Sequence, residues 1–388
     1  MKNILIDALP LLSPLTGVGR YTYEISKRLQ ELYDGKYEIL FNYGFCSKEL
    51  YRPSNSQTGI EQKAKKIQSF IKKIPLLKKF IRKFYSFIAK FDLRIYDLYW
   101  QPSFIPNQNI RAKKLICTLH DFSFKLQPHW HPKERIEYFN KNFDLVKKAD
   151  HVITGSNFTK QEIIDYMQIP QDKISVIYHG VNRELYREYP QDELQETKAE
   201  FDLPKKFLLF VGSIEPRKNL LTLLKAYNLL SKEEKDKLPL ILVGFKGWSN
   251  QETMQEVEKN QEHIRYLGYV SDTKLSHIYN LATIFIYPSL YEGFGLPPLE
   301  AMACGTPVIV SNVASLPEVC GSAALYVDPT DIEDIKDKIL ILLNDEILRE
   351  EFSKKSKAQA ALFSWDKAAQ EHLKVMASLL ETRIHPRL

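Results

Sequence analysis

The sequence has few cysteines, and none of them lie in close pairs. Its 388 residues include four cysteines, at positions 46, 117, 304 and 320, with no C-x-x-C spacing. Structural zinc sites and disulfide frameworks need closely or regularly spaced cysteines, so the sequence predicts neither. Scattered thiols are typical of a reducing compartment, and we expect a cytoplasmic protein.

Long apolar runs are missing as well. No stretch approaches the roughly 20 apolar residues that span a bilayer. The run Lys2–Asp7 is short and ends in an acidic residue. It therefore predicts a buried first β-strand rather than a signal peptide.

Several signatures of metal and nucleophile chemistry have no match. The chain contains no D-x-D triplet and no H-E-x-x-H, G-x-S-x-G or G-x-x-x-x-G-K-[ST] motif. The common device that holds a diphosphate through a metal ion is thus absent from the sequence. We expect a protein that requires neither a metal nor a cofactor.

Positive charge is concentrated in one segment. The net charge is +6, but residues 61–90 hold ten Lys/Arg and one acidic residue, Glu61, which leaves −3 for the rest. Apolar residues recur there at helical spacing from Ile67 to Ile88. A helix with one basic face and one apolar face is predicted to lie at the surface of an anionic membrane. The alternative is a helix whose apolar face packs on its own domain. The lysines and arginines expected to contact the membrane are Lys72, Lys73, Lys78, Lys79, Arg82 and Lys83.

The length and the order of predicted elements indicate two domains. A chain of 388 residues exceeds what one core usually serves. Strand patterns, such as Leu115–Leu119 and Ile284–Tyr287, alternate with helix patterns, such as Glu134–Ala149, which predicts parallel sheets. A polar stretch at 183–206 separates two such series. We place the first domain at 1–189, the second at 205–364, and a helical C-terminal segment at 365–388.

Two strand ends in the first domain carry candidate ligand contacts. The first strand leads into a loop with Gly17 and Gly19 and then a helix, an arrangement that lets a ligand approach the backbone. The pattern G-x-G-x-x-T is a weak dinucleotide fingerprint. A later strand ends at His120 and Asp121, where open α/β sheets place ligands; the alternative is a structural histidine.

In the second domain, two cations precede a predicted helix. Arg217 and Lys218 follow Pro216 and come just before a helix that begins at Leu220. Cations at a helix N-terminus favour an anion, and we expect both side chains at the surface of a cleft. The alternative is that they are solvated surface charges.

A turn further on places two carboxylates eight residues apart. Glu292 lies on a glycine-containing loop. Pro297 and Pro298 suit the first turn of the following helix, and Glu300 is expected in that turn. The N–H groups of 294–296 lie between them, free to bind an anion. A phosphorylated, polyhydroxylated molecule would use both kinds of group. The alternative is that Glu300 only complements the helix dipole and the glycines only make the turn.

Together these residues resemble a known family. The segments Gly-Ser-Ile-Glu-Pro-Arg-Lys-Asn (212–219) and Glu-Gly-Phe-Gly-Leu-Pro-Pro-Leu-Glu (292–300), with His120 and the Gly17–Gly19 loop, are similar to retaining glycosyltransferases of family 4. Among these, the chain looks most like bacterial polysaccharide mannosyltransferases. The resemblance implies the α/β fold called GT-B: two Rossmann-like domains facing across a cleft. It also implies that the C-terminal helix crosses back to the first domain.

The resemblance assigns roles residue by residue. It implies that Arg217 and Lys218 hold the diphosphate, Glu292 the donor sugar, Glu300 the ribose, and that His120 contacts the sugar from the first domain. It also implies that the segment 268–272, which includes Tyr269, binds the base. Many members have an arginine where this chain has Ser213, so fewer cations are implied at the diphosphate. The donor-binding residues implied in this way are Gly17, Gly19, Ser213, Arg217, Lys218, Tyr269, Val270, Glu292, Gly293, Phe294, Gly295, Leu296 and Glu300.

The implied function is retaining transfer of a hexosyl group, mannose from GDP-mannose, to a lipid-linked glycan acceptor in bacterial surface polysaccharide synthesis. The implied location is the inner face of the cytoplasmic membrane. Two alternatives remain: a transferase that uses a UDP-sugar, and a non-transferring sugar-nucleotide enzyme of the same fold, such as an epimerase. A non-enzymatic lipid- or nucleic-acid-binding protein would leave Arg217, Lys218, Glu292 and Glu300 unexplained. Since no aromatic-basic RNA motif occurs, we expect no nucleic-acid partner.

Overall fold

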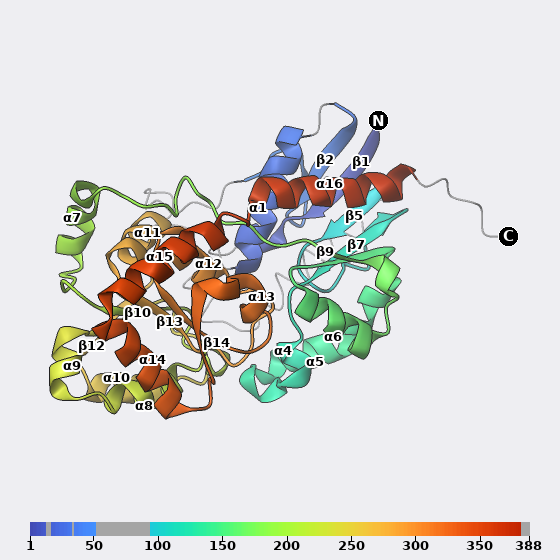
Figure 1. Cartoon of the computed structure of the whole chain (residues 1–388). Coiled ribbons are helices and arrows are strands. Elements are labelled where there is room, and N and C mark those ends of the chain that lie inside the picture. Colours follow the sequence, from blue (N-terminus) through green and yellow to red (C-terminus); the bar gives the residue numbers. More distant parts are fainter. Residues whose placement is uncertain (13–16, 33–34, 52–93, 382–388) are drawn as a thin grey trace, which may run out of the picture.

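The computed structural model describes residues 1–12, 17–32, 35–51 and 94–381, which form two α/β halves (Figure 1). Each half is built around its own sheet, as the alternation of strand and helix patterns predicts. The basic segment 61–90, with its six lysines and arginines expected at a membrane, lies outside the described residues.

The first half contains a seven-stranded sheet in the order β3-β2-β1-β5-β7-β8-β9. All neighbours are parallel except β2 and β3. The inner strands are continuous apolar runs because both faces of a parallel sheet are covered. The strands are β1 (Lys2–Asp7), β2 (Tyr37–Asn42), β3 (Cys46–Ser47), β5 (Leu98–Gln101), β7 (Leu115–Leu119), β8 (His151–Thr154) and β9 (Ile174–Val176), with a separate pair, β4 (Ile95–Tyr96) and β6 (Arg111–Ala112).

The helices of the first half differ from the sequence prediction at two points. The helix expected from Glu134 to Ala149 ends at Asn142 and continues as a 3-10 segment. Gly17 and Gly19, expected in a loop, instead form the first turn of α1. The helices are α1 (Gly17–Leu32), α4 (Ser123–Leu126), α5 (Lys133–Asn142) and α6 (Asn157–Met167), with 3-10 segments η1 (Leu9–Leu12), η2 (Pro128–Trp130), η3 (Phe143–Lys148) and η4 (Gln171–Lys173).

The second half contains a six-stranded sheet, parallel throughout, in the order β12-β11-β10-β13-β14-β15. Its two middle strands, β10 and β13, are fully buried apolar runs. Their carboxyl ends carry the loops with the two cations and with Glu292, and open α/β sheets bind ligands at such ends. The strands are β10 (Leu208–Val211), β11 (Leu240–Val243), β12 (Ile264–Gly268), β13 (Ile284–Tyr287), β14 (Val308–Ser311) and β15 (Ala324–Val327).

Helices surround this second sheet, and one of them lies in the stretch interpreted as a linker. The polar region 183–206 contains α7, which packs against α11. The helices are α7 (Gln191–Glu200), α8 (Leu220–Asn228), α9 (Lys232–Lys237), α10 (Gln251–Lys259), α11 (Asp272–Leu281), α12 (Leu296–Ala303), α13 (Leu316–Cys320), α14 (Ile332–Asn344) and α15 (Glu346–Ala360), with 3-10 segments η5 (Pro216–Lys218) and η6 (Gly321–Ala323).

The last helix, α16 (Trp365–Glu381), lies on the first half although it follows α15 of the second (Figure 1). It runs beside α1. Its buried residues, among them Trp365, Ala369 and Met376, share a core with Ile4 and Trp100. Burial of this apolar stripe ties the end of the chain to the first sheet.

None of the helices in the described part of the chain is both long and apolar enough to cross a membrane.

Candidate active site

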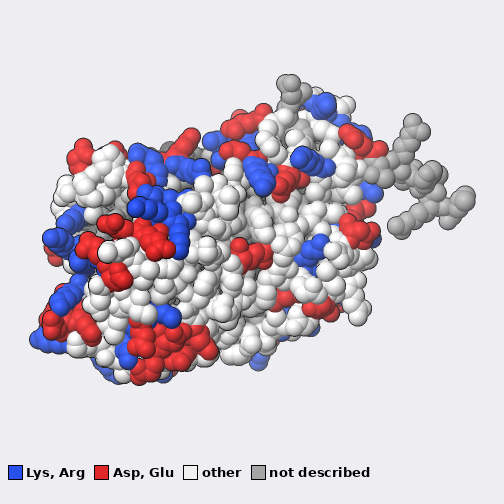
Figure 2. Space-filling view, in the orientation of Figure 1, with Lys and Arg blue, Asp and Glu red and all other residues white. Residues whose placement is uncertain are grey.

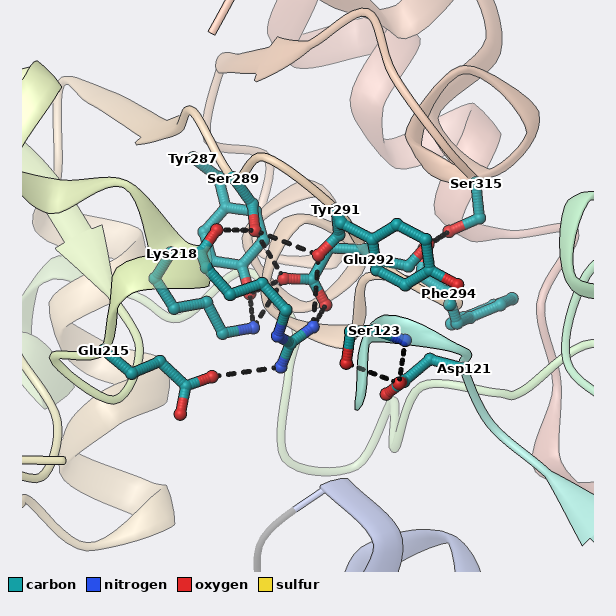
Figure 3. Close-up of polar contacts among 12 residues, drawn as sticks. Asp121, Ser123, Glu215, Lys218, Tyr287, Ser289, Tyr291, Glu292, Phe294 and Ser315 are labelled. Carbon is teal, nitrogen blue, oxygen red and sulfur yellow. Dashed lines mark hydrogen bonds and ion pairs between the residues drawn. The ribbon is translucent and has the colours of Figure 1, made fainter. Parts of the chain in front are cut away.

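The centre of the candidate site is the carboxylate of Glu292, which is 6% exposed. Lys218 Nζ lies 2.5 Å from one of its oxygens, and Arg217 Nη1 lies 3.1 Å from the other. The hydroxyls of Ser289 and Tyr287 also donate to it, at 2.7 and 2.9 Å (Figure 3). A buried carboxylate with this many donors is fixed in position and remains charged.

A short turn after β10 presents the two cations. Segment η5 starts with Pro216, which suits a first helical position. It ends at Lys218, and the next residue, Asn219, has a φ of 58° that turns the chain into α8. Asn219 Nδ2 then donates to the carbonyls of Pro288 (2.9 Å) and Pro329 (2.7 Å). The turn is therefore attached to the loops after β13 and β15.

Burial and neighbouring charges together shift the pKa values of these groups. Burial alone would raise the pKa of Glu292, but the charges of Arg217 and Lys218 lower it to about 2. Burial and the neighbouring Arg217 lower the pKa of Lys218. The side chains of Arg217 and Lys218 are only 15% and 10% exposed. The prediction that both lie at a cleft surface is wrong, because each is drawn inward to neutralise Glu292.

The loop after Glu292 presents backbone N–H groups. Gly295 has a φ of 106°, a conformation that favours glycine, and it caps α12. Ser315 Oγ donates to the carbonyls of Glu292 and Phe294, at 2.9 and 3.0 Å. Within the described part of the chain, the N–H groups of Phe294, Gly295 and Leu296 donate no hydrogen bond. They are available to an anion, as expected.

His120 lies where this loop meets the first half. A Cβ at Gly293 would be 1.7 Å from the His120 carbonyl oxygen, so only glycine permits this contact. His120 Nε2 is 2.7 Å from the carbonyl of Pro102, and burial lowers the pKa of the ring. The neutral ring thus donates from Nε2 and keeps Nδ1 as an acceptor. Asp121 faces the cations from the same side, and its charge helps to raise the pKa of Arg217 against the effect of burial (Figure 3).

Glu300 lies one turn into α12, not in its first turn as expected. It is 6% exposed, and burial raises its pKa to about 6. Arg20, one residue after Gly19 on α1, reaches across to it, at 3.5 Å, and to Asp272, at 2.9 Å. Arg20 is not among the residues predicted from the sequence. Its position directly after the G-x-G pair was the available signal.

The remaining donor-binding candidates lie around these groups. Tyr269, about half exposed, stacks on Phe245 with ring centroids 4.6 Å apart, whereas Val270 is buried. Ser213 is half-buried just after β10. Gly17 faces Leu296, with 3.8 Å between the position of an added Cβ and Leu296 Cδ1. The neighbouring Gly19 is buried within α1.

A buried cluster of aromatic and histidine rings lies behind His120 and was not predicted. Tyr21 on α1 packs against the rings of His120 and His179. Its hydroxyl is 2.6 Å from His372 Nε2 on α16 and 3.1 Å from Thr118 Oγ1. His179 also packs on Phe294 of the glycine loop. The three histidines are far apart in the sequence, so no local pattern indicates the cluster.

Comparison with known proteins places these features in a family. The model "Glycosyltransferase Family 4" matches residues 15–185, and the model "Glycosyl transferases group 1" matches residues 191–359. The chain is 36% identical to O-antigen chain mannosyltransferase B of Escherichia coli over 370 residues, which is 94% of this chain and 96% of that protein. It is 33% identical to the serotype-specific mannosyltransferase WbdA of Escherichia coli over 287 residues. That match covers 72% of this chain and 35% of WbdA, so the chain spans about a third of that relative.

The fold is that of known GT-B glycosyltransferases, as the resemblance implied. Sucrose-phosphate synthase from Thermosynechococcus elongatus superposes with a TM-score of 0.71 at 19% identity, over 99% of this chain and 100% of the other. At this identity the likeness concerns the fold alone.

We expect the ion pairs of Glu292 to make Lys218 important for stability. Lys218→Met should lower the free energy of unfolding by about 3 kcal/mol, because a buried carboxylate loses one of its two cations. Adding Glu292→Gln should recover part of this loss. Denaturant unfolding would measure both. Lys237→Met, which breaks an exposed pair with Glu233, is the control and should change little. Equal effects at 218 and 237 would contradict this account.

We also expect nucleotide binding to depend on pH through Glu300. Its pKa of about 6 means that it becomes protonated as the pH falls from 7 to 5 and no longer accepts hydrogen bonds from both ribose hydroxyls. The dissociation constant for a nucleoside diphosphate, measured by calorimetry, should therefore rise by up to about tenfold per pH unit below 6. The terminal phosphate also titrates in this range. The readout is thus the difference from Glu300→Gln, and the same slope in both proteins would exclude Glu300.

Proposed function

The chain belongs to the glycosyltransferases of family 4, and we propose that it transfers mannose from GDP-mannose, with retention, to a glycan acceptor in bacterial polysaccharide synthesis. We choose mannose because the chain is 36% identical to an O-antigen chain mannosyltransferase over almost its whole length. The geometry around Glu292 supports the chemistry, because it gathers two cations, free amides and a carboxylate at the carboxyl edge of the second sheet.

The diphosphate leaving group is stabilised by groups of this chain. Within the described residues, Arg217 Nε is buried and has no hydrogen-bond partner, so this donor is available for a phosphate oxygen. Lys218 and the N–H groups of Phe294 and Gly295 add positive potential beside it. Preorganised donors of this kind stabilise developing negative charge strongly, and we propose that no metal ion is required.

Retention is proposed to proceed by attack of the acceptor on the face that the diphosphate leaves. The bond from C1 of mannose to the diphosphate oxygen breaks, a bond from C1 to the acceptor oxygen forms, and the acceptor proton passes to the departing phosphate. Glu292 is a poor nucleophile for a covalent route, since two cations hold it and its pKa is about 2. His120 Nδ1 accepts a hydrogen bond from a sugar hydroxyl in this scheme.

We expect purified protein to be stabilised against heat more by GDP than by UDP or ADP, because ligands that bind only the folded state raise its unfolding temperature. Transfer from GDP-mannose should continue in excess EDTA. Stabilisation by UDP alone, with turnover of a UDP-sugar, would reassign the donor. Activity that is lost in EDTA and restored by magnesium or manganese would disprove the metal-free mechanism.

The acceptor is proposed to be lipid-linked, with the protein bound to the inner face of the cytoplasmic membrane. The support is the +9 charge and the apolar helical stripe of residues 61–90. On the described face in Figure 2, by contrast, Lys/Arg and Asp/Glu are interspersed toward the two ends, and the middle is mainly uncharged. Such a mixed surface has no strong preference for anionic lipid.

Reversal of Lys72, Lys73, Lys78 and Lys79 to glutamate should release the protein from anionic liposomes in a flotation assay. It should slow transfer to a membrane-embedded acceptor and leave a short soluble acceptor nearly unaffected. A control with the same charge change reverses exposed lysines of the second half: Lys232, Lys237, Lys259 and Lys355. Equal losses on both acceptors would mean that the segment packs on its own domain, and undiminished liposome binding would refute lipid docking.

A further inference from the structure

A cavity of about 420 Å³ opens between the two halves, beside the candidate active site. The first half contributes Gln127, between α4 and η2, and Trp130, the last residue of η2. The second half contributes the segments that follow β13, β14 and β15, including Asn312 and Asp328. Volumes of this size are typical of small-molecule sites.

The order of strands places this cavity on one particular side of Glu292. Tyr269, in the segment expected to bind the base, follows β12 at one edge of the second sheet. Arg217 follows β10 and Glu292 follows β13, in the middle. The cavity lies beyond them, toward the β15 edge. A donor whose base lies near Tyr269 and whose sugar lies near Glu292 would extend across the carboxyl ends of the strands, from β12 toward β13. The cavity would then lie next to its sugar.

The wall of the cavity is hydrogen-bonded to the turn that carries Arg217 and Lys218. Leu290, which lines the cavity, donates its N–H to the Arg217 carbonyl at 2.9 Å. The carbonyl of Pro329, another lining residue, accepts from Asn219 Nδ2 at 2.7 Å. A ligand in the cavity would thus lie against the same loops that hold the two cations and Glu292.

The lining is suited to a neutral polyhydroxylated ligand. It combines the Trp130 indole with the amides of Gln127 and Asn312, and with Asp328 and Thr330. Asp328 is already oriented, since it accepts from the Thr330 N–H and hydroxyl at 2.8 and 2.6 Å. Among the described lining residues none is Lys or Arg, so nothing there favours a phosphate. Aromatic faces with amide and carboxylate groups match the C–H faces and hydroxyls of a pyranose.

We propose that this cavity binds the terminal sugar of the glycan acceptor. The proposal rests on the proposed function, which requires an acceptor hydroxyl close to the donor sugar. Trp130 stacks on the acceptor ring, and Asn312 and Asp328 bind its hydroxyls. These are positioning contacts for the acceptor, separate from the groups that stabilise the diphosphate.

The test compares acceptor and donor kinetics in Trp130→Ala. With GDP-mannose and a short mannoside acceptor, the variant should raise the acceptor KM by about tenfold, which corresponds to about 1.4 kcal/mol. The donor KM and the slow hydrolysis of the donor without acceptor should stay within about twofold of the wild type. The matched control is Tyr166→Ala, which removes an exposed aromatic ring of α6 outside the cavity and should change none of these values.

A second variant guards against a trivial loss of folding. Asn312→Trp adds volume at an exposed position, so it should block the acceptor without disturbing the core, and circular dichroism should give an unchanged unfolding temperature. A parallel fall in donor hydrolysis in both variants would mean that the cavity holds the donor sugar. An unchanged acceptor KM in both would mean that it holds neither sugar, and either result overturns the proposal. If the wild type uses another sugar nucleotide, the donor assignment fails, and the same comparison with that donor still tests the cavity.

Discussion

The buried carboxylate of Glu292 is the group around which the site is built. An ionised carboxylate can be buried only if cations and hydrogen-bond donors compensate for the lost water, and here Lys218 and Arg217 do so from a separate turn. This requirement draws both cations away from solvent and fixes their positions. It also leaves Arg217 Nε buried without a partner among the described residues. The site is therefore preorganised for an anion before any donor binds.

The two halves meet at groups that belong to the same site. Gly293 packs on the backbone of His120, and Arg20 spans from α1 to Glu300 on α12. Behind this contact, the hydroxyl of Tyr21 joins α1 to His372 of α16. The C-terminal helix thus supports the cluster of rings that packs against His120. A change in the relative position of the halves would therefore alter the contacts of Glu300 and of the Glu292 loop.

Much of the fold followed from local sequence patterns. The apolar runs of the parallel strands, such as Leu115–Leu119 and Ile284–Tyr287, were predicted with the boundaries that the structure has. The start of α12 was predicted from its two prolines. Two predicted helix boundaries were wrong. The helix predicted from Glu134 changes to a 3-10 segment after Asn142, and Gly17, predicted in a loop, begins α1. Glycine adopts many backbone conformations, and helix ends often change to 3-10 pitch, so local patterns do not fix these boundaries.

The sequence by itself determined the residue types of the site and their local spacing: two adjacent cations before a helix, and two glutamates eight residues apart around a glycine turn. Only the tertiary structure decided which of them meet. Burial of Glu292 pairs it with Arg217 and Lys218, more than 70 residues away in the chain. Docking of the halves brings Arg20 to Glu300. Local propensity cannot encode these contacts, because the cost of burying a charge is paid only when distant segments pack together.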